Sequence, residues 1–400
     1  MPAATWGLKT VESEVGGNGA PSLRIVASSK AATREERGVF DAALDDIGVD
    51  HSIWEVFDRF MGLSARGTAP QAVRAYAGEE LAGLAFVIRC RAYGRAVFDT
   101  PAFRIPIDLV GLPSFIWIRA GLCAEAAANP GFVARGHDQG AVQAAMLRHL
   151  KSTSCGVVVI DRPENAWLHA GGQVYPYVAD GILDLEGFGR VEDFVASHGS
   201  VDRKLKEYAR KGGCVEVRHG RVPEAMLSRF QACMESTVNR SIVYSPFQGL
   251  FPGIVAETCR IDRPEMVHFV TRLKGQVMGY HTFVRAGQGL RMVHGAFDRT
   301  LPTTHHAYES LIVRVAEYAI EHGLTRAHFG PVMNETKRRM MNVSHPCALY
   351  FHTQYALVRL LFPPIFRRTK MQSAALLAFS ANSHTSSRRG FGARLPRGAR

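Results

Sequence analysis

The sequence reads LAGLAFVIR at residues 81–89 and VMGYHTFVR at residues 277–285, which lie 196 residues further on. The two stretches align without a gap, so Gly83 corresponds to Gly279 and Arg89 to Arg285. Each stretch is bordered by turn residues and by further short apolar runs, which is typical of a three-stranded antiparallel meander. The sequence therefore predicts an internal duplication.

A helix and a returning strand are expected after each meander. These segments are residues 140–151 and 156–161 in the first copy and residues 304–322 and 326–329 in the second. In the second helix, apolar residues from Ala307 to Ala319 recur on one stripe, with Thr303 and Thr304 as the expected cap and Gly323 as the end. This order predicts an α/β fold of the α+β type, with a mixed sheet in two similar halves.

Composition divides the chain further. The expected parts are a disordered tail at residues 1–22, two domains at 23–185 and 186–355, a basic linking helix at 200–212, and a basic tail at 356–400. The last part holds nine Lys or Arg and no Asp or Glu, out of a net charge of +12 for the whole chain. The rest of the chain is therefore nearly neutral, which argues against a nucleic-acid-binding fold.

Several classes of protein are excluded. A chain of 400 residues that is 46% hydrophobic and 21% charged is globular. Its apolar runs are far shorter than the roughly 18 residues that cross a bilayer, and its N-terminus has no secretory pattern, so a cytoplasmic protein is expected. Seven scattered cysteines without a CxxC predict reduced thiols, and no metal is expected. P-loop, serine-hydrolase, zincin and dinucleotide-binding motifs do not occur.

The order of elements resembles the tandem-GNAT acyltransferases, which include the FemAB-like peptidoglycan aminoacyltransferases and their CelD-like relatives. The stretches that carry the resemblance are residues 176–220, residues 266–323 and FGPVMNETKRRM at residues 329–340. The resemblance implies a bacterial N-acyltransferase that moves an acyl or aminoacyl group to an amine in a cleft between the two domains. The implied acceptor is a small molecule or a cell-envelope precursor.

One junction departs from the family's pattern. GNAT proteins that use acetyl-CoA have a glycine-containing loop before the long helix, where backbone N–H groups hold the CoA pyrophosphate. Residues 298–308 contain no glycine, so the resemblance leaves two donors open, acyl-CoA and aminoacyl-tRNA. The N-terminus of the helix is expected to be an anion site with either donor.

Four residues are candidates for catalysis: Lys337, His281, His294 and Tyr308. Lys337 corresponds to the Lys-Arg-Arg run of the family and would hold a phosphate or stabilise an oxyanion, and as an exposed residue it is expected to contribute little to stability. The alternative is a solvent-facing basic turn without a role in the reaction. The two histidines are expected on paired strands, where one of them could accept a proton, and Tyr308 could act as a general acid. The alternatives are core or surface side chains.

Six further residues are candidates for binding an anionic substrate or tRNA. They are Arg203, Lys204, Lys206, Arg210, Arg338 and Arg339. The alternative for the linking helix is a solvated charged face. A different reading of the whole chain is a catalytically silent tandem-GNAT binding protein, whose basic tail contacts a membrane or a nucleic acid.

Overall fold

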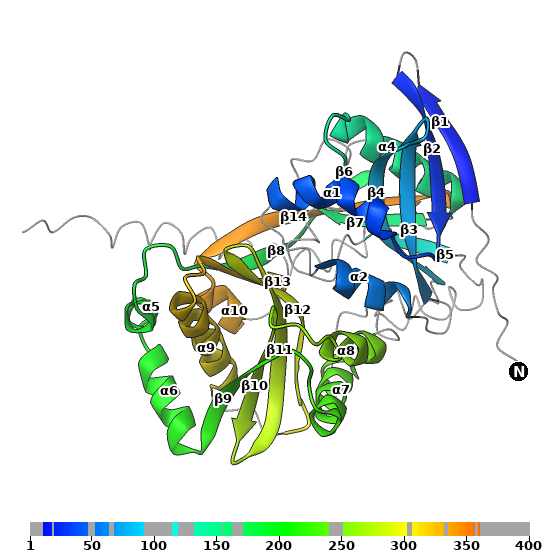
Figure 1. Ribbon diagram of the computed structural model, residues 1–400. Coiled ribbons are helices and arrows are strands. Elements are labelled where there is room, and N and C mark those ends of the chain that lie inside the picture. The colour runs from blue at the N-terminus through cyan, green and yellow to red at the C-terminus, as the bar shows by residue number, and fades with distance from the viewer. Residues whose placement is uncertain are drawn as a thin grey trace, which may run out of the picture.

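A computed structural model of the chain describes most of the sequence between residues 11 and 360 (Figure 1). The described ranges are 11–17, 20–46, 53–63, 68–91, 114–118, 132–154, 156–161, 171–239, 251–301, 306–331, 335–356 and 359–360. The strands are β1 (Val11–Gly17), β2 (Ala20–Ser28), β3 (Thr68–Ala77), β4 (Glu80–Arg91), β5 (Ser114–Ile118), β6 (Phe132–Val133), β7 (Gly156–Asp161), β8 (Gln173–Asp184), β9 (Gly213–His219), β10 (Met266–Leu273), β11 (Gln276–Ala286), β12 (Gly289–Phe297), β13 (Arg326–Pro331) and β14 (Val343–Thr353). The helices are α1 (Arg34–Asp46), α2 (Ile53–Met61), α4 (Gln139–Thr153), α5 (Val191–Ser197), α6 (Val201–Arg210), α7 (Glu224–Asn239), α8 (Phe251–Cys259), α9 (Ala307–Glu321) and α10 (Glu335–Met340).

One mixed sheet runs through the described chain in the order β1-β2-β3-β4-β5-β7-β14-β8-β13-β12-β11-β10-β9, and β6 pairs with β4 beside this path. We call β1 to β7 the first half and β9 to β13 the second half. If β1 is left out, the strands counted inward from one edge of the sheet have the same arrangement as those counted inward from the other edge. The strands β2, β3 and β4 correspond to β9, β10 and β11, and the parallel pair β5 and β7 corresponds to β12 and β13. The predicted mixed α/β fold with an internal duplication is confirmed.

The 196-residue repeat holds at single residues. Ala75 of β3 pairs with Gly83 of β4, and a bulge follows. Thr271 of β10 pairs with Gly279 of β11, and a bulge follows at the same place. A Cβ added at Gly83 would lie 2.5 Å from Cγ1 of Val142, and a Cβ added at Gly279 would lie 2.5 Å from Cδ1 of Phe297. Both positions therefore require the smallest residue. The glycines that align in the sequence therefore hold the same place beside a bulge, although Gly83 lies against Val142 of α4 and Gly279 against Phe297 of β12.

Helices cover both faces of the sheet. The helices α1, α2, α7 and α8 pack on one face, and α4 and α9 pack on the other. The apolar stripe of α9 is buried as expected, with Leu311 and Val315 in the core of the second half. The helix begins after His306, which has a φ of +66°, rather than at the predicted Thr303 and Thr304, which lie outside the described residues. Gly323, with a φ of +66°, ends it as predicted.

Two strands join the halves by exchange. At the centre of the sheet β8 pairs antiparallel with β14. On its other side β8 pairs with β13 of the second half, while β14, which comes last in the chain, pairs with β7 of the first half. The strand that follows the first half in the chain, β8, therefore completes the sheet of the second half, and β14, which follows the second half, completes the sheet of the first. The pairing of β8 with β14 makes the backbone hydrogen bonds continuous across the junction.

A shared core fills one side of this junction. Leu84 and Phe86 of β4 pack in one apolar cluster with Val284 of β11. Beside them α2 lies against α8 (Figure 1), and Arg59 Nη1 lies 3.4 Å from Glu257 Oε2. The predicted cleft between the halves is therefore closed by side chains on this face.

The predicted disorder of residues 1–22 is wrong over part of its range. Val11–Gly17 form β1, an edge strand that pairs antiparallel with β2, and β2 itself begins at Ala20. The sequence of β1 has Val11 and Val15 on either side of three polar residues and ends before Asn18-Gly19, a dipeptide typical of hairpins. The glycine-rich composition at this point therefore marks a strand connection and not a tail.

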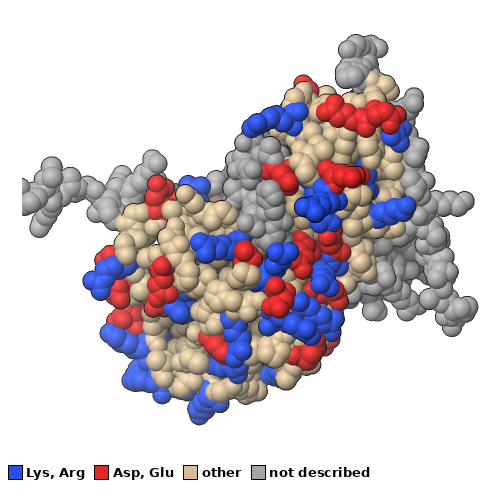
Figure 2. All heavy atoms as spheres, viewed as in Figure 1, with Lys and Arg blue, Asp and Glu red and all other residues tan. Residues whose placement is uncertain are grey.

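Two other expectations fall largely outside the described residues. One is the third strand of the first meander, which the sequence places at residues 95–99, and the other, apart from 356 and 359–360, is the basic tail at residues 356–400. In the described chain no helix is long and apolar enough to cross a membrane. On the face shown in Figure 2, Lys and Arg are interspersed with Asp and Glu, in agreement with a nearly neutral body.

Candidate active site

The parallel strands β12 and β13 part from one another in the second half. Their pairing runs from Gly289 opposite Arg326 to Arg291 opposite His328, and β12 then continues for six residues without this partner. A bulge at Val293 interrupts the pairing of β12 with β11 just beyond this point. Because a bulge bends and twists its strand, it turns β12 away from β13. The result is a sheet that is open beside the N-terminus of α9.

A second bulge places a carbonyl group at the opening. The pairing of β13 with β8 shifts between His328 and Gly330, so Phe329 has no partner in that ladder. The carbonyl oxygen of Phe329 instead accepts a hydrogen bond of 2.6 Å from Nζ of Lys337. The helix α10, which follows β13 directly, thereby brings its lysine back onto the end of the strand.

Lys337 is buried, and the expectation of an exposed basic turn is wrong. Its exposed fraction is 7%, and its ammonium group donates to the carbonyl group of Phe329 on β13. Burial lowers the pKa of Lys337 to about 8, and the nearby carboxylate of Asp180 on β8 acts in the opposite direction. The lysine therefore exchanges its proton close to neutral pH, which is the range in which proton transfer and oxyanion stabilisation are useful.

His281 of β11 lies on the face of the sheet that α9 covers, beneath the N-terminus of that helix. Burial, with a smaller effect of the Lys337 charge, lowers the pKa of His281 to about 3, so the imidazole is neutral. Its Nδ1 has no hydrogen-bond partner among the described residues. A Cβ added at Gly295 on the paired strand would lie 2.6 Å from the imidazole ring, so a glycine is required there for the ring to fit.

Aromatic rings surround this imidazole. The ring centroid of His281 lies 5.5 Å from that of Tyr308 and 6.2 Å from that of Phe329. Phe297, at the end of β12, also lies 5.5 Å from Tyr308. Three of the four predicted catalytic residues, His281, Tyr308 and Lys337, thus come together at the opening.

His294 does not join them. It faces α8 on the opposite side of the sheet, where Nε2 lies 2.6 Å from Oγ1 of Thr258. Burial lowers the pKa of His294 to about 3 as well. The two histidines lie on paired strands as expected, but only His281 is at the opening, because the bulge at Val293 shifts the register by one residue. Thr282 therefore stands opposite His294, and the imidazole changes face.

The first turn of α9 holds a carboxylate of its own. Oε1 of Glu309 accepts a hydrogen bond of 2.9 Å from Nζ of Lys204 and one of 2.8 Å from Nη2 of Arg339. His306 Nδ1 lies 3.8 Å from the same oxygen. Burial raises the pKa of Glu309, but the hydrogen bonds from Lys204 and from its own backbone N–H, together with these charges, lower it overall. The expected anion site at this helix is therefore filled by a side chain.

The predicted substrate-binding cations are largely used within the protein. Lys204 and Arg339 are bound to Glu309, and Lys206 lies 2.7 Å from Asp202. Arg338 lies 2.7 Å from Glu335. Arg203 and Arg210 are exposed on α6, the predicted linking helix, and have no ion pair among the described residues.

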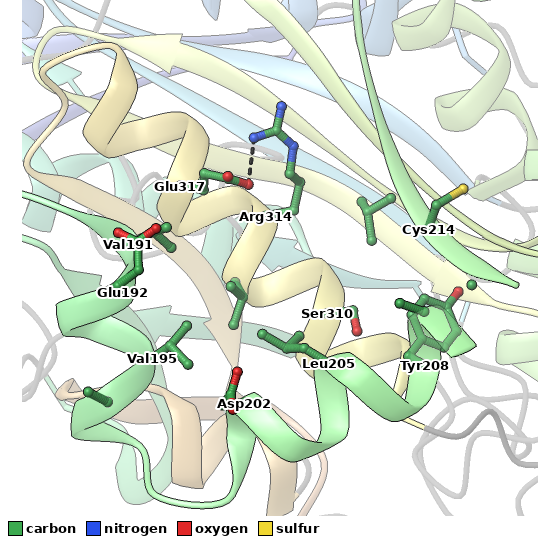
Figure 3. A pocket seen from close by; sticks show the side chains of 15 residues that line it. Val191, Glu192, Val195, Asp202, Leu205, Tyr208, Cys214, Ser310, Arg314 and Glu317 are labelled. Atoms are coloured by element: carbon green, nitrogen blue, oxygen red, sulfur yellow. Dashed lines mark hydrogen bonds and ion pairs between the residues drawn. The ribbon is translucent and has the colours of Figure 1, made fainter. Parts of the chain in front are cut away.

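A separate open groove of about 620 Å³ lies between α5, α6, β9 and α9 (Figure 3). Its walls are mainly apolar, with Val195, Leu205 and Val313 among the lining side chains, and Arg314 lies 2.6 Å from Glu317 on its rim. The predicted catalytic and substrate-binding residues, all of which the structure describes, do not line it. The groove is therefore distinct from the opening between β12 and β13.

Two important residues escaped the sequence reasoning. Asp180 is an acidic residue inside an apolar strand, and Glu309 is an acidic residue on the buried side of an amphipathic helix. Either irregularity could have indicated a buried ion pair. In the described part of the chain no three His, Cys, Asp or Glu side chains are placed to hold a metal ion.

Comparison with known proteins gives one family. Residues 197–338, from the end of α5 to α10, match the family model of the acetyltransferase (GNAT) domain. No curated protein has a significant sequence match to this chain.

Solved structures with a similar backbone share little sequence. The C-terminal domain of a putative lysylphosphatidylglycerol synthetase from Agrobacterium fabrum is 12% identical, with 85% of this chain and 96% of that chain covered and a TM-score of 0.48. FemX is 13% identical, with coverages of 83% and 99% and a TM-score of 0.47. A tandem GNAT protein from the clavulanic acid pathway is 11% identical, with coverages of 83% and 98% and a TM-score of 0.47.

The family model identifies the second half, and the repeated register identifies the first half as its duplicate. Residues 197–338 of this chain are therefore similar to the acetyltransferase (GNAT) domain, and the first half repeats the same arrangement of strands.

Proposed function

We propose that this protein is an N-acyltransferase that moves an acyl or aminoacyl group from a thioester or an aminoacyl-tRNA to an amine. The observation that carries the proposal is the burial of a lysine with a lowered pKa beside a neutral imidazole, at the point where β12 and β13 of the GNAT domain part. Groups with shifted pKa values gather at functional sites more often than elsewhere.

The reaction requires little beyond alignment and charge stabilisation. The amine nitrogen attacks the carbonyl carbon, and the carbonyl oxygen becomes an oxyanion. When the intermediate collapses, the C–S or C–O bond to the leaving group breaks and the new C–N bond remains. One proton passes from the amine to the leaving group, so no other reactant is consumed.

Three residues have defined roles in this scheme. Lys337 in its charged form stabilises the oxyanion, and the carboxylate of Asp180 favours that form. His281 stays neutral, so its Nδ1 can accept a hydrogen bond from the attacking amine and orient it. The hydroxyl of Tyr308 donates a proton to the leaving group and takes up the proton of the amine.

The proposal is tested with charged tRNA and with acyl-CoA as labelled donors and a set of amine acceptors. We expect label transfer by the wild-type protein, and a loss of about 100-fold or more in Lys337→Met. Lys274→Met is the matched control, because this lysine is exposed in the turn between β10 and β11 and is not among the candidate site residues. Equal loss in both variants would contradict the role of Lys337.

A catalytically silent binding protein is the second candidate. The filled anion site at α9 favours it, because a carboxylate stands where a CoA-dependent enzyme would bind its donor. In that case a donor would raise the melting temperature without any transfer of label.

A further inference from the structure

A carboxylate and two cations of the protein itself lie at the N-terminus of α9. Glu309 is 6% exposed in the first turn, and one of its oxygens accepts hydrogen bonds from Lys204 and Arg339 at 2.9 and 2.8 Å. Its own backbone N–H also stabilises the carboxylate. The arrangement contains what a helix offers to a bound phosphate, namely a backbone N–H at the positive end of the helix dipole and two cations.

We propose that Glu309 is a specificity residue that occupies the phosphate position of α9 and thereby excludes acyl donors that would bind there through a pyrophosphate. The inference deepens the proposed function, because it concerns the donor of the same site. In this proposal the carboxylate of Glu309 lies where the pyrophosphate of CoA would otherwise bind.

The first half shows the same feature independently. The helix α4 is the counterpart of α9 in the duplicated fold, since it connects the parallel pair β5 and β7 as α9 connects β12 and β13. Its cap residue Asp138 accepts a hydrogen bond of 2.8 Å from the backbone N–H of Ala141. Both helices therefore have a carboxylate at the N-terminus, where it interacts with a backbone N–H of the first turn.

The charges predict what happens when the carboxylate is removed. In Glu309→Gln the side chain keeps its size but loses its charge, while Lys204 and Arg339 keep theirs beside the end of the helix. Two cations without a counterion near a helix N-terminus make an anion site. We therefore expect this variant to bind pyrophosphate and CoA, although the wild-type protein does not.

The experiment measures binding of inorganic pyrophosphate and of CoA by calorimetry, on the wild-type full chain and on variants. We expect no binding to wild type at millimolar concentrations and a dissociation constant at least about tenfold lower in Glu309→Gln. The double variant Glu309→Gln, Lys204→Gln should lose most of the gained affinity. Glu317→Gln, two turns further along α9 and paired with Arg314, should gain nothing.

Two outcomes would overturn the inference. One is binding of pyrophosphate or CoA to the wild-type protein with an affinity that Glu309→Gln leaves unchanged. The other is an absence of binding in both proteins. Glu309→Ala asks the same question if the glutamine variant does not fold, and melting curves identify that case. Because the readout is binding, a failure here leaves acyl transfer from another donor intact, and a lack of transfer leaves this result intact.

Discussion

Replacing Lys337 by Met should change how the stability of the protein depends on pH. Burial lowers the pKa of Lys337 from 10.5 to about 8. One pKa unit corresponds to about 1.4 kcal/mol, so holding the charged lysine in the folded protein costs about 3 kcal/mol relative to its neutral form. This cost is large compared with the total stability of a typical domain, about 5–15 kcal/mol.

The sign follows from proton binding. Between about pH 8 and pH 10.5 the unfolded chain keeps the lysine protonated while the folded chain does not, so the wild type becomes more stable as the pH rises through this window. Below about pH 8 both states are protonated and the full cost is present. Met has a similar size and no charge, so Lys337→Met lacks this dependence.

Urea unfolding at intervals from pH 7 to pH 10.5 measures the difference. The free energy of unfolding of wild type minus that of Lys337→Met should rise by about 3 kcal/mol across the window. The loss of the hydrogen bond to the carbonyl of Phe329 adds a constant and does not affect the slope. The exposed Lys206→Met should show no such trend. A difference that is independent of pH would refute the lowered pKa of Lys337.

Three other changes follow from the contacts. Asp180→Asn removes the carboxylate that raises the pKa of Lys337, so the alkaline limit of the transfer rate should move to lower pH; an unmoved limit in a pH–rate profile would exclude this lysine as the titrating group. Gly295→Ala should displace the imidazole of His281, which the new Cβ would contact at 2.6 Å, and should lower the free energy of unfolding by about 1–3 kcal/mol and the transfer rate more than about tenfold. Wild-type values in both assays would contradict this geometry. Glu36→Ala leaves the buried Arg74 without its carboxylate at 2.6 Å, so urea unfolding should show a loss of about 3 kcal/mol, and a loss below about 1 kcal/mol would show that the pair contributes little.

Much of the fold could be predicted from local patterns. The repeat was visible because Gly83 and Gly279 each stand beside a bulge with a side chain too close for a Cβ, which restricts both positions to glycine. The helix α9 was visible because its buried stripe has the period of a helix. The exchange of β8 and β14 was not visible, because pairing between strands more than 150 residues apart leaves no mark in either local pattern.

The site could be predicted only in part, for related reasons. Lys337 stands in a run of basic residues, and such a run resembles a solvated turn unless the position of the bulged Phe329 is known. The two histidines would face each other if the register of Phe283 opposite Met292 continued, since His281 would then pair with His294. A bulge of one residue reverses that outcome, and a single sequence does not show where it falls.

The most direct test of the account is a single-turnover transfer assay that follows the labelled acyl group and the melting temperature in the same samples. Wild-type protein and Lys337→Met are each mixed with charged tRNA or acyl-CoA and an amine acceptor set. The account predicts that a donor which raises the melting temperature of both proteins delivers its label to an amine only with wild type. Stabilisation of both proteins by a donor, with no labelled amide from either, would contradict an acyltransferase and support a silent binding protein.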